Sequence, residues 1–536
     1  MKIQTKTLKK VPLLVALAIL ASLPIQSLIT NFTKNDTTNQ VNAFEALSIS
    51  QNQGATAGGT DVTISGLGFD EALNIDIVQV SASSSHSLAL SSDGKVYAWG
   101  HNSDGALGDG STTARPSPVA VDTTGVLKDK IIVAVSAGTH FSLALGSDGK
   151  VYAWGNGWML GYSPALENQT SPIAVNASGV LAGKTITDIA AGPYHSLALD
   201  STGNVYSWGD NTQGQLGDGT TSSDNSPIAV DVSGVLAGKT LVGIAAGYYH
   251  SAVLDSNGKV YAWGYGVSGQ LGNGTSANSL SPVAVNTAGV LSGKTITTIA
   301  AGDYHSLALD SDGKVYAWGY GNVGQLGNSD TINQASPVAV DTSGVLAGKT
   351  IVSIAAGSDH SLALDSDGKV YAWGRNTLGQ LGDGIVDHHQ SSPVTVDTSG
   401  VLAGKTVTAI TAGSYHSLAL DSNGKIYAWG SDNQGQLGNG ATTGNQVSPV
   451  TVDTNPATSA LGYVPGPISV TFDPTGTATE CTNVVLVDEN TITCTTSAHI
   501  AGTVDVLVSD TVRTSTLKQA FTYKDITPEV PDTGAK

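Results

Sequence analysis

Short runs of alternating apolar and polar residues fill most of this chain, and turns rich in glycine separate them. In the segment HSLALDSDGKVYAWG, for example, Leu307, Leu309 and Val315 alternate with small or polar residues on both sides of Asp312 and Gly313. Alternation with a period of two is typical of β-strands, and Asp-Gly tolerates the positive φ angles of a tight hairpin turn. The pattern therefore predicts an all-β protein built from short hairpins.

The same unit recurs seven times along the chain. Its first marker is a histidine, found at His86, His140, His195, His250, His305, His360 and His416. Its second marker is a tryptophan that follows 13 residues later, or 14 where we take Phe141 to be an insertion, at Trp99, Trp154, Trp208, Trp263, Trp318, Trp373 and Trp429. One unit has too few apolar residues for a core of its own, so neighbouring units must stack. Seven sheets stacked around an axis predict a propeller.

These repeated histidines and tryptophans are interpreted as structural residues. A ring of seven histidines could suggest metal binding, but each histidine has the same place in its unit. There its ring can bond backbone groups between strands.

Three motifs of the unit, His-Ser-Leu-Ala-Leu, Tyr-Ala-Trp-Gly and Gly-Gln-Leu-Gly, resemble the repeat of the regulator of chromosome condensation (RCC1-like) family. The resemblance covers about residues 76–452 and implies a seven-bladed β-propeller, which we place at residues 76–455. The first unit departs from Gly-Gln-Leu-Gly at Ala106, and the second reads Trp158-Met159-Leu160-Gly161. Trp158 is therefore either a binding residue or a packing substitute.

The segments on both sides of the propeller resemble two parts of one immunoglobulin-like (IPT/TIG) domain. ATAGGTDVTISGLGF resembles its opening and ECTNVVLVDENTITCTTSAHIAGTVDVLVSD its closing strands. Because a closed ring brings its ends together, residues 44–75 and 464–524 can form one β-sandwich around the propeller. The alternative is two incomplete sandwiches. Cys481 and Cys494 either form a disulfide in an oxidising compartment or remain two buried thiols.

Residues 1–43 have the features of an export segment. Lys2, Lys6, Lys9 and Lys10 precede an apolar run from Val11 to Leu23, as in a signal peptide or an uncleaved anchor. We therefore expect a secreted or cell-surface protein. In the tail, residues 525–536, the sequence from Val530 to Gly534 resembles a sortase sorting motif, although no apolar stretch follows it.

The charge balance narrows the range of partners. Lys and Arg total 24 against 43 Asp and Glu, which gives a net charge of −19 and a field that repels phosphate backbones. We expect no nucleic-acid partner, and contact with a membrane only through an uncleaved N-terminal segment. The expected partner of this monomeric protein is another protein or a surface glycan.

No sequence pattern indicates catalysis, a metal site or a cofactor. A nucleophile elbow, a phosphate-binding loop and a zincin helix are all missing from the sequence. The Asp-Ser-Asp-Gly segments that begin at Asp310 and Asp365 are interpreted as hairpin turns, because the later ligands of a calcium loop are absent. Asp387, His388 and His389 are interpreted as a solvated loop. A carboxylate pair in the central channel is the one enzyme hypothesis left.

Two loop positions of the repeat vary between units and are rich in tyrosine. The position before the repeat histidine holds Tyr194, Tyr249, Tyr304 and Tyr415, and the position after Trp-Gly holds Tyr265, Tyr320 and Arg375. Tyrosine and arginine are typical contact anchors, although the tyrosines could instead cap the blade interiors.

We therefore expect a non-catalytic binding protein that acts outside the cell. One alternative is a secreted enzyme inhibitor. The family resemblance also implies guanine-nucleotide exchange, but the export segment argues against an intracellular GTPase as partner.

Overall fold

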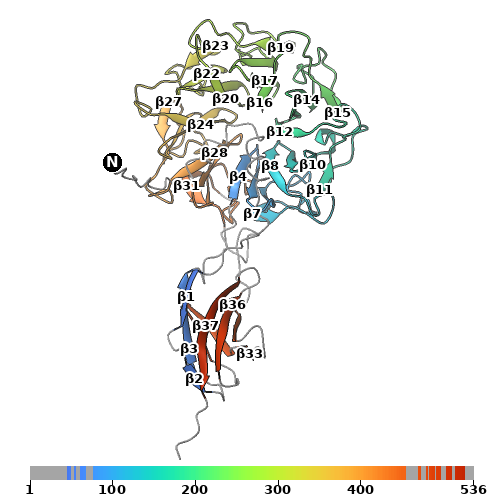
Figure 1. Cartoon of the computed structure of the whole chain (residues 1–536). Coiled ribbons are helices and arrows are strands. Elements are labelled where there is room, and N and C mark those ends of the chain that lie inside the picture. The colour runs from blue at the N-terminus through green and yellow to red at the C-terminus, as the bar shows by residue number, and fades with distance from the viewer. Residues whose placement is uncertain are drawn as a thin grey trace, which may run out of the picture. The chain divides into compact units, whose positions relative to one another are not determined.

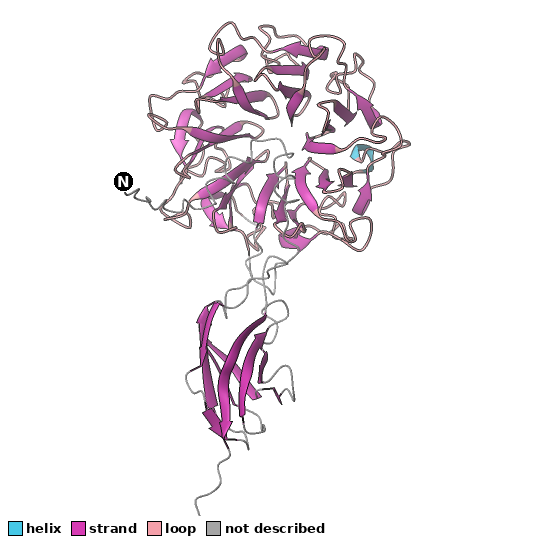
Figure 2. Cartoon of the chain, in the orientation of Figure 1, coloured by secondary structure: helices cyan, strands magenta, loops and turns pink. Residues whose placement is uncertain are grey.

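The computed structural model describes residues 45–49, 53–55, 61–67, 77–442, 444–453, 469–472, 479–480, 482–488, 491–495, 502–509 and 514–524. These residues fall into two compact units, one within residues 75–461 and one built from segments on both sides of it. Figure 2 shows that strands dominate both units, with one short 3-10 helix, η2 (Gly157–Met159). Within the described ranges, no helix has the length and apolarity needed to cross a membrane. The predicted export segment and the Val530–Gly534 motif lie outside the described residues.

The larger unit consists of seven four-stranded antiparallel sheets, each built from a continuous stretch of chain. Blades 1 and 2 are β4 (Ile77–Ala82), β5 (His86–Ser91), β6 (Val96–Gly100), β7 (Arg115–Ala120) and β8 (Ile132–Ala137), β9 (Phe141–Gly146), β10 (Val151–Gly155), β11 (Gln169–Ala174). Blades 3 and 4 are β12 (Ile186–Ala191), β13 (His195–Asp200), β14 (Val205–Gly209), β15 (Asp224–Ala229) and β16 (Leu241–Ala246), β17 (His250–Asp255), β18 (Val260–Gly264), β19 (Ser279–Ala284). Blades 5 and 6 are β20 (Ile296–Ala301), β21 (His305–Asp310), β22 (Val315–Gly319), β23 (Gln334–Ala339) and β24 (Ile351–Ala356), β25 (His360–Asp365), β26 (Val370–Gly374), β27 (Gln390–Thr395). Blade 7 is β28 (Val407–Ala412), β29 (His416–Asp421), β30 (Ile426–Gly430) and β31 (Gln446–Thr451).

The sheets form a closed ring, which confirms the predicted seven-bladed propeller. The first strand of each blade contacts the first strand of the next, and β28 of the last blade contacts β4 of the first. Figure 1 shows these first strands nearest the middle and the fourth strands, from β7 to β31, at the rim. Consequently the first strands surround a central channel, while the second and third strands of every blade are buried between neighbours.

The hairpin between the second and third strands follows the sequence expectation. In blade 5, Asp310 Oδ1 accepts hydrogen bonds from the backbone N of Asp312 and of Lys314, both at 2.9 Å. Gly313 has φ +72°, where a side chain would be strained. The hydroxyl of Tyr316 donates to Asp310 Oδ2 at 2.8 Å. This aspartate is therefore a structural residue that holds the turn.

Each blade is joined to the next through Gly-Gln-Leu-Gly and the tryptophan. Trp263 Nε1 of blade 4 donates to the backbone carbonyl of Gln215 in blade 3 at 2.8 Å. A Cβ on Gly217 would lie 2.6 Å from Trp263 Nε1, so only glycine lets the chain pass the indole this closely. Trp99 donates to the carbonyl of Gln436 at 2.9 Å, so the same contact closes the ring between blades 7 and 1.

The repeat histidines bond to serines of the following blade. His195 Nε2 lies 2.8 Å from Ser251 Oγ, and Ser251 Oγ donates to the carbonyl of Gln215 at 2.8 Å. Since the serine gives its proton to the carbonyl, the histidine carries a proton on Nε2. The same bond joins His86–Ser142, His250–Ser306, His305–Ser361, His360–Ser417 and His416–Ser87, at 2.8 to 2.9 Å. The expected partners were backbone groups, and the structure shows a side chain.

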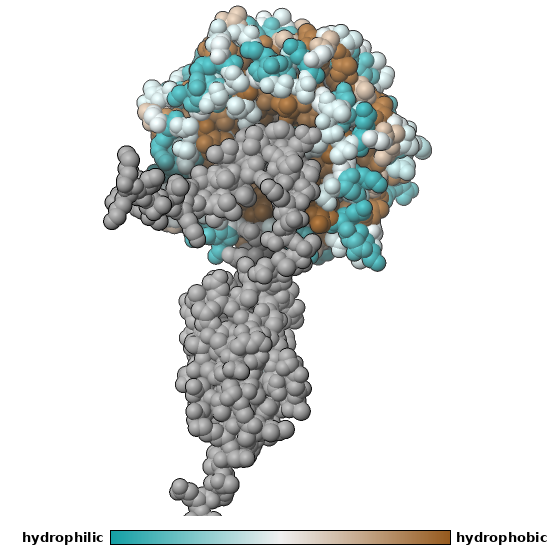
Figure 3. Space-filling model, viewed as in Figure 1, coloured by the Kyte–Doolittle hydropathy of each residue, from teal (hydrophilic) through white to brown (hydrophobic). Residues whose placement is uncertain are grey.

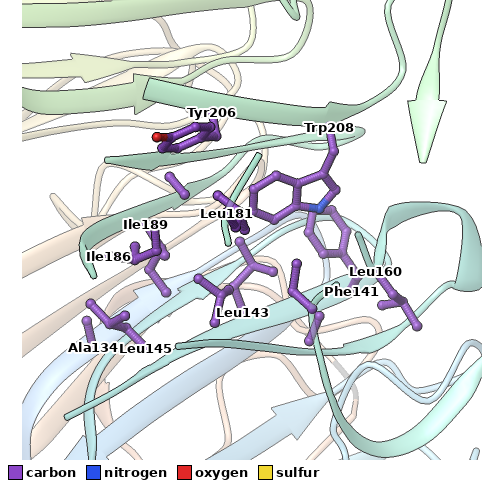
Figure 4. Close-up of a cluster of buried hydrophobic side chains, with 14 residues drawn as sticks. Ala134, Phe141, Leu143, Leu145, Leu160, Leu181, Ile186, Ile189, Tyr206 and Trp208 are labelled. Atoms are coloured by element: carbon purple, nitrogen blue, oxygen red, sulfur yellow. The ribbon is translucent and has the colours of Figure 1, made fainter. Parts of the chain in front are cut away.

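Blade 2 corrects the assignment of one repeat residue. Phe141 pairs with Gly155, just as His195 pairs with Gly209, so Phe141 replaces the repeat histidine and is no insertion. His140 occupies the variable position before it and is not a structural counterpart of the others. Figure 4 shows the Phe141 ring beside Trp208 and Leu160 in the apolar core between blades 2 and 3. Phenylalanine has no ring nitrogen, and within the described part of the chain Ser196 Oγ, the counterpart of Ser251 Oγ, is buried without a hydrogen-bond partner.

The smaller unit contains two sheets, and each of them combines strands from both ends of the chain. Their orders are β1-β3-β35-β34 and β2-β37-β36-β32-β33. The strands are β1 (Glu45–Ile49), β2 (Gln53–Ala55), β3 (Asp61–Leu67), β32 (Ser469–Phe472), β33 (Thr479–Glu480), β34 (Thr482–Asp488), β35 (Thr491–Thr495), β36 (Gly502–Ser509) and β37 (Thr514–Lys524). Asp61 pairs with Thr495, and Gln53 with Thr522. Cys481 lies outside the described residues, so its disulfide with Cys494 stays a prediction.

Candidate partner-binding face

The two variable loop positions meet on one face of the propeller. In an antiparallel meander, successive loops lie on opposite faces, so the first and third loops of each blade share one face. The backbone N of the position after Trp-Gly donates to the carbonyl of the position before the histidine in every blade, at 2.8 to 2.9 Å. The pairs are Ser85/His101, His140/Asn156, Tyr194/Asp210, Tyr249/Tyr265, Tyr304/Tyr320, Asp359/Arg375 and Tyr415/Ser431. Each blade thus presents two adjacent side chains that are free to differ.

Six tyrosines of blades 3, 4 and 5 form a continuous set of ring contacts, which we call the tyrosine cluster. Its members are Tyr194, Tyr248, Tyr249, Tyr265, Tyr304 and Tyr320. Tyr248 is central to it: its ring centroid lies 4.4 Å from that of Tyr249 and 5.7 Å from that of Tyr304. All six rings are partly buried, so they pack on one another and still reach the surface.

The other candidate residues lie apart from this cluster. Tyr415 is 38% exposed, and among the described rings none forms a stacked or edge contact with it. Arg375 pairs with Asp359, with Nη1 3.1 Å from Oδ2. Trp158 on η2 is 61% exposed. Its neighbour Met159 occupies the position that holds glutamine in Gly-Gln-Leu-Gly, and the Met159 backbone carbonyl accepts a hydrogen bond from Trp208 Nε1 at 3.0 Å. The indole of Trp158 therefore does not serve as a packing substitute.

Sequence reasoning missed Tyr248, which stands two residues before the repeat histidine. The same position holds Pro193 in blade 3 and Asp303 in blade 5, so no repetition marked it. The doubled Tyr248-Tyr249 in front of His250 was the only available signal. Burial and contact with Tyr194 raise the Tyr248 pKa, so its hydroxyl remains protonated and donates to the Tyr194 hydroxyl at 3.4 Å.

A cavity of about 90 Å³ opens at the middle of this face, where the loops between first and second strands converge. Its lining is small residues from all seven blades, such as Ala301 and Gly302, together with one acidic residue, Asp303. A Cβ on Gly302 would lie 2.6 Å from the His305 ring, so the glycine leaves room for the imidazole, whereas blade 1 has Ser83 at this position, 2.9 Å from His86 Nδ1 through its Oγ. Burial raises the pKa of Asp303 to about 6, and the charge of Asp359 adds to the shift.

A second carboxyl with a raised pKa lies on a first strand. Burial raises the pKa of Asp188, in β12, to about 7, while a hydrogen bond from the backbone N of Ile189 opposes the shift. Asp188 and Asp303 do not contribute to each other's pKa shifts, so these two carboxyls are not a coupled pair. Among the described residues, no group of three or more His, Cys, Asp or Glu could hold a metal ion.

Histidines of blades 1 and 2 form a smaller polar group on the same face. The rings of His101 and His140 meet edge to face at 6.3 Å, and His140 Nδ1 lies 3.0 Å from Asp104 Oδ2. In the third loop of blade 6, His388 Nε2 lies 3.2 Å from Asp383 Oδ2. In the view of Figure 3, hydrophilic residues lie mostly around the rim of the propeller and hydrophobic ones closer to its middle.

Comparison with known proteins identifies the family. The model of the RCC1-like domain matches residues 45–288 and 167–466. The ultraviolet-B receptor UVR8 of Arabidopsis thaliana is 35% identical over 367 residues, which cover 68% of this chain and 79% of UVR8. The E3 ubiquitin-protein ligase HERC2 of Homo sapiens is 34% identical over 365 residues, but these are 7% of its length.

Solved structures show the same fold. Prp20p of Saccharomyces cerevisiae has a TM-score of 0.59 at 24% identity, covering 76% of this chain and 93% of its own. Human WBSCR16 has a TM-score of 0.58 at 23% identity, covering 76% and 99%. The matched ring, its seven blades and the family model together show that this chain belongs to the RCC1-like family.

Proposed function

We propose that this protein is a non-catalytic binding protein of the cell exterior, and that the face with the tyrosine cluster contacts its partner. The observation that carries the proposal is the cluster itself, in which three adjacent blades present six partly buried tyrosines beside a cavity. Tyrosine and arginine are enriched among the residues that dominate binding energy. Six aromatic rings on the loops of a repeat scaffold are more than blade packing requires, since blade 1 has no tyrosine at these positions.

The partner is a protein or a surface glycan. Protein binding is supported by a relative of the same fold, since Prp20p is described by its binding to Gsp1p and histones. The net charge of −19 disfavours nucleic acid. The basic front and apolar run of residues 1–43 support a place outside the cell, and the smaller unit, as an IPT/TIG immunoglobulin-like domain, would serve as a stalk or second adhesive surface.

Affinity capture from cell-surface and culture fractions tests this proposal. The full chain is compared with Tyr265→Ala/Tyr320→Ala in the cluster and with Val290→Ala/Val345→Ala as the matched control. The two valines are 41% and 40% exposed on loops of the opposite face, between blades. We expect a partner that the wild type and the valine variant retain and the tyrosine variant loses. Equal capture by all three proteins, or turnover of a small molecule, would contradict the proposal.

A further inference from the structure

Three carboxylates stand at or beside the tyrosine cluster, and they differ in their partners. Asp210 Oδ2 accepts from Gln215 Nε2 at 2.8 Å and from the Thr212 hydroxyl at 2.9 Å. Asp359 is neutralised by Arg375. Asp303 lines the cavity and has no Lys, Arg or His within ion-pair distance among the described residues. The Ser358 side chain hydrogen-bonds to Asp303, but no cation in the described part of the chain neutralises it, so this carboxylate can take a cation from a partner.

The rings next to Asp303 suit the same kind of group. Tyr304 follows it in sequence, and the Tyr304 ring stacks on that of Tyr248 at 5.7 Å and 20°. Burial raises the pKa of the Tyr304 hydroxyl to about 12 and the nearby charge of Asp303 adds to the shift, since the carboxylate and the phenol lie close together. A cation near an aromatic face is attracted by the ring quadrupole, and the attraction grows where water is displaced.

Three buried amides of the same face lack partners in the described structure. Gln270, Gln325 and Gln380 are 0% exposed, and their Nε2 atoms have no hydrogen bond. In blades 3 and 7, the equivalent amides donate to Asp210 and Ser431, the residues after Trp-Gly. In blades 4 to 6 that position holds Tyr265, Tyr320 and Arg375, which accept no such bond. The residue after Trp-Gly therefore decides whether the buried amide has a partner.

We propose that Asp303 and the adjoining tyrosine cluster bind a lysine or arginine side chain of an extended basic peptide segment in the partner. This inference rests on the proposed function and specifies its chemistry. The cation pairs with Asp303 at the cavity, its aliphatic stem lies against the Tyr248 and Tyr304 rings, and the peptide passes over the tyrosine cluster.

The test measures binding of fluorescein-labelled hexa-arginine to the full chain by fluorescence anisotropy at pH 7.5 and 150 mM salt. Hexacitrulline, which has the same shape without the charge, is the neutral probe. Asp303→Asn is compared with Asp129→Asn, which removes one exposed charge from a loop of the opposite face where φ is +58° and asparagine fits. We expect Kd to rise about tenfold for Asp303→Asn and for Tyr304→Ala, and less than twofold for Asp129→Asn.

Equal weakening by the two aspartate variants would mean that the acidic field alone attracts the peptide, and this result would overturn the inference. Equal affinity for hexacitrulline would overturn it as well. Thermal melting confirms that each variant is folded. The captured partner separates the two proposals: if Tyr304→Ala loses it while Asp303→Asn retains it, the face binds a partner but not through a cation. If both variants retain it, the inference fails, and the proposed function fails only if Tyr265→Ala/Tyr320→Ala retains the partner as well.

Discussion

Ser196 and Ser251 occupy the same place in blades 3 and 4, yet the structure predicts opposite effects when each is replaced by alanine. Ser251 Oγ donates to the Gln215 carbonyl and accepts from His195, both at 2.8 Å. Ser196 Oγ is buried with no hydrogen-bond partner among the described residues, because Phe141 stands where the preceding blade would supply a histidine. The two serines have the same size and are equally inaccessible to solvent, at 0%. The comparison therefore isolates the hydrogen bonds.

The expected magnitudes follow from these contacts. Ser251→Ala removes two hydrogen bonds, each worth about 1 kcal/mol net, and leaves the buried His195 Nε2–H unpaired, for a total loss of about 3 kcal/mol. The Gln215 carbonyl keeps its bond from Trp263. Ser196→Ala removes a buried hydroxyl whose desolvation nothing offsets, so we expect a gain of about 1 kcal/mol. The two variants should differ by about 4 kcal/mol.

Urea unfolding followed by tryptophan fluorescence measures the difference, with circular dichroism as a second probe of cooperativity. Repeat proteins can depart from two-state behaviour, so midpoints are compared only if both probes coincide. A loss of stability in Ser196→Ala comparable to that in Ser251→Ala would refute the reasoning, because it would mean that the hydroxyl of Ser196 is satisfied. As a further check, Phe141→His would supply Ser196 with a hydrogen-bond partner. Adding Ser196→Ala to that variant should therefore give no gain in stability.

Three further predictions concern glycine, histidine and aspartate positions. Gly217→Ala should lower the free energy of unfolding by about 2 kcal/mol or more, since φ is +72° and the new Cβ would clash with Trp263. The control Gly234→Ala, which has open space around it, should be neutral or slightly stabilising in the same unfolding experiment. Burial lowers the pKa of His86, His195, His250, His305, His360 and His416 to about 3, so these residues favour the native state above pH 6.5 and that contribution is lost as pH falls from 6.5 towards 3. At pH 5 the loss in free energy of unfolding is about 2 kcal/mol per histidine. Acid unfolding should therefore occur above pH 4, with uptake of several protons. A propeller that keeps its near-ultraviolet circular dichroism at pH 3 would contradict this. Asp303 has the opposite sign, because its folded pKa of about 6 lies above the unfolded value of 3.8 and its ionisation costs stability as pH rises. Asp303→Asn should therefore stabilise by up to about 3 kcal/mol at pH 7.5 and by about half as much at pH 5, and a gain independent of pH would disprove the assignment.

The sequence was sufficient for the propeller because its repeat encodes contacts between blades as well as strands. Trp263 and Gly217 lie in different blades but touch, so their regular recurrence reports the packing. The same regularity misled the assignment of His140, because a histidine one residue from the expected place looks like an insertion until the pairing of Phe141 with Gly155 is seen.

The candidate site was only partly predictable. Tyr249 and Tyr304 could be found from their repeat position, but Tyr248 could not, because it recurs in no other blade. The isolation of Asp303 from cations depends on distances across blades, which no linear pattern gives. The pairing of Arg375 with Asp359 likewise joins positions 16 residues apart in sequence.

Every blade is made from one continuous stretch of chain, and the junction between blades 7 and 1 has the histidine-serine and tryptophan-carbonyl bonds of the internal junctions, from which only that between blades 2 and 3 departs, at Phe141. His416 meets Ser87 at 2.9 Å, and Trp99 meets the Gln436 carbonyl at 2.9 Å, with no strand exchanged between the ends. Closure of the ring therefore does not depend on the blade at which the chain enters it. Circular permutants that open it at any loop between blades, with the old ends linked, should therefore assemble the same seven-bladed ring.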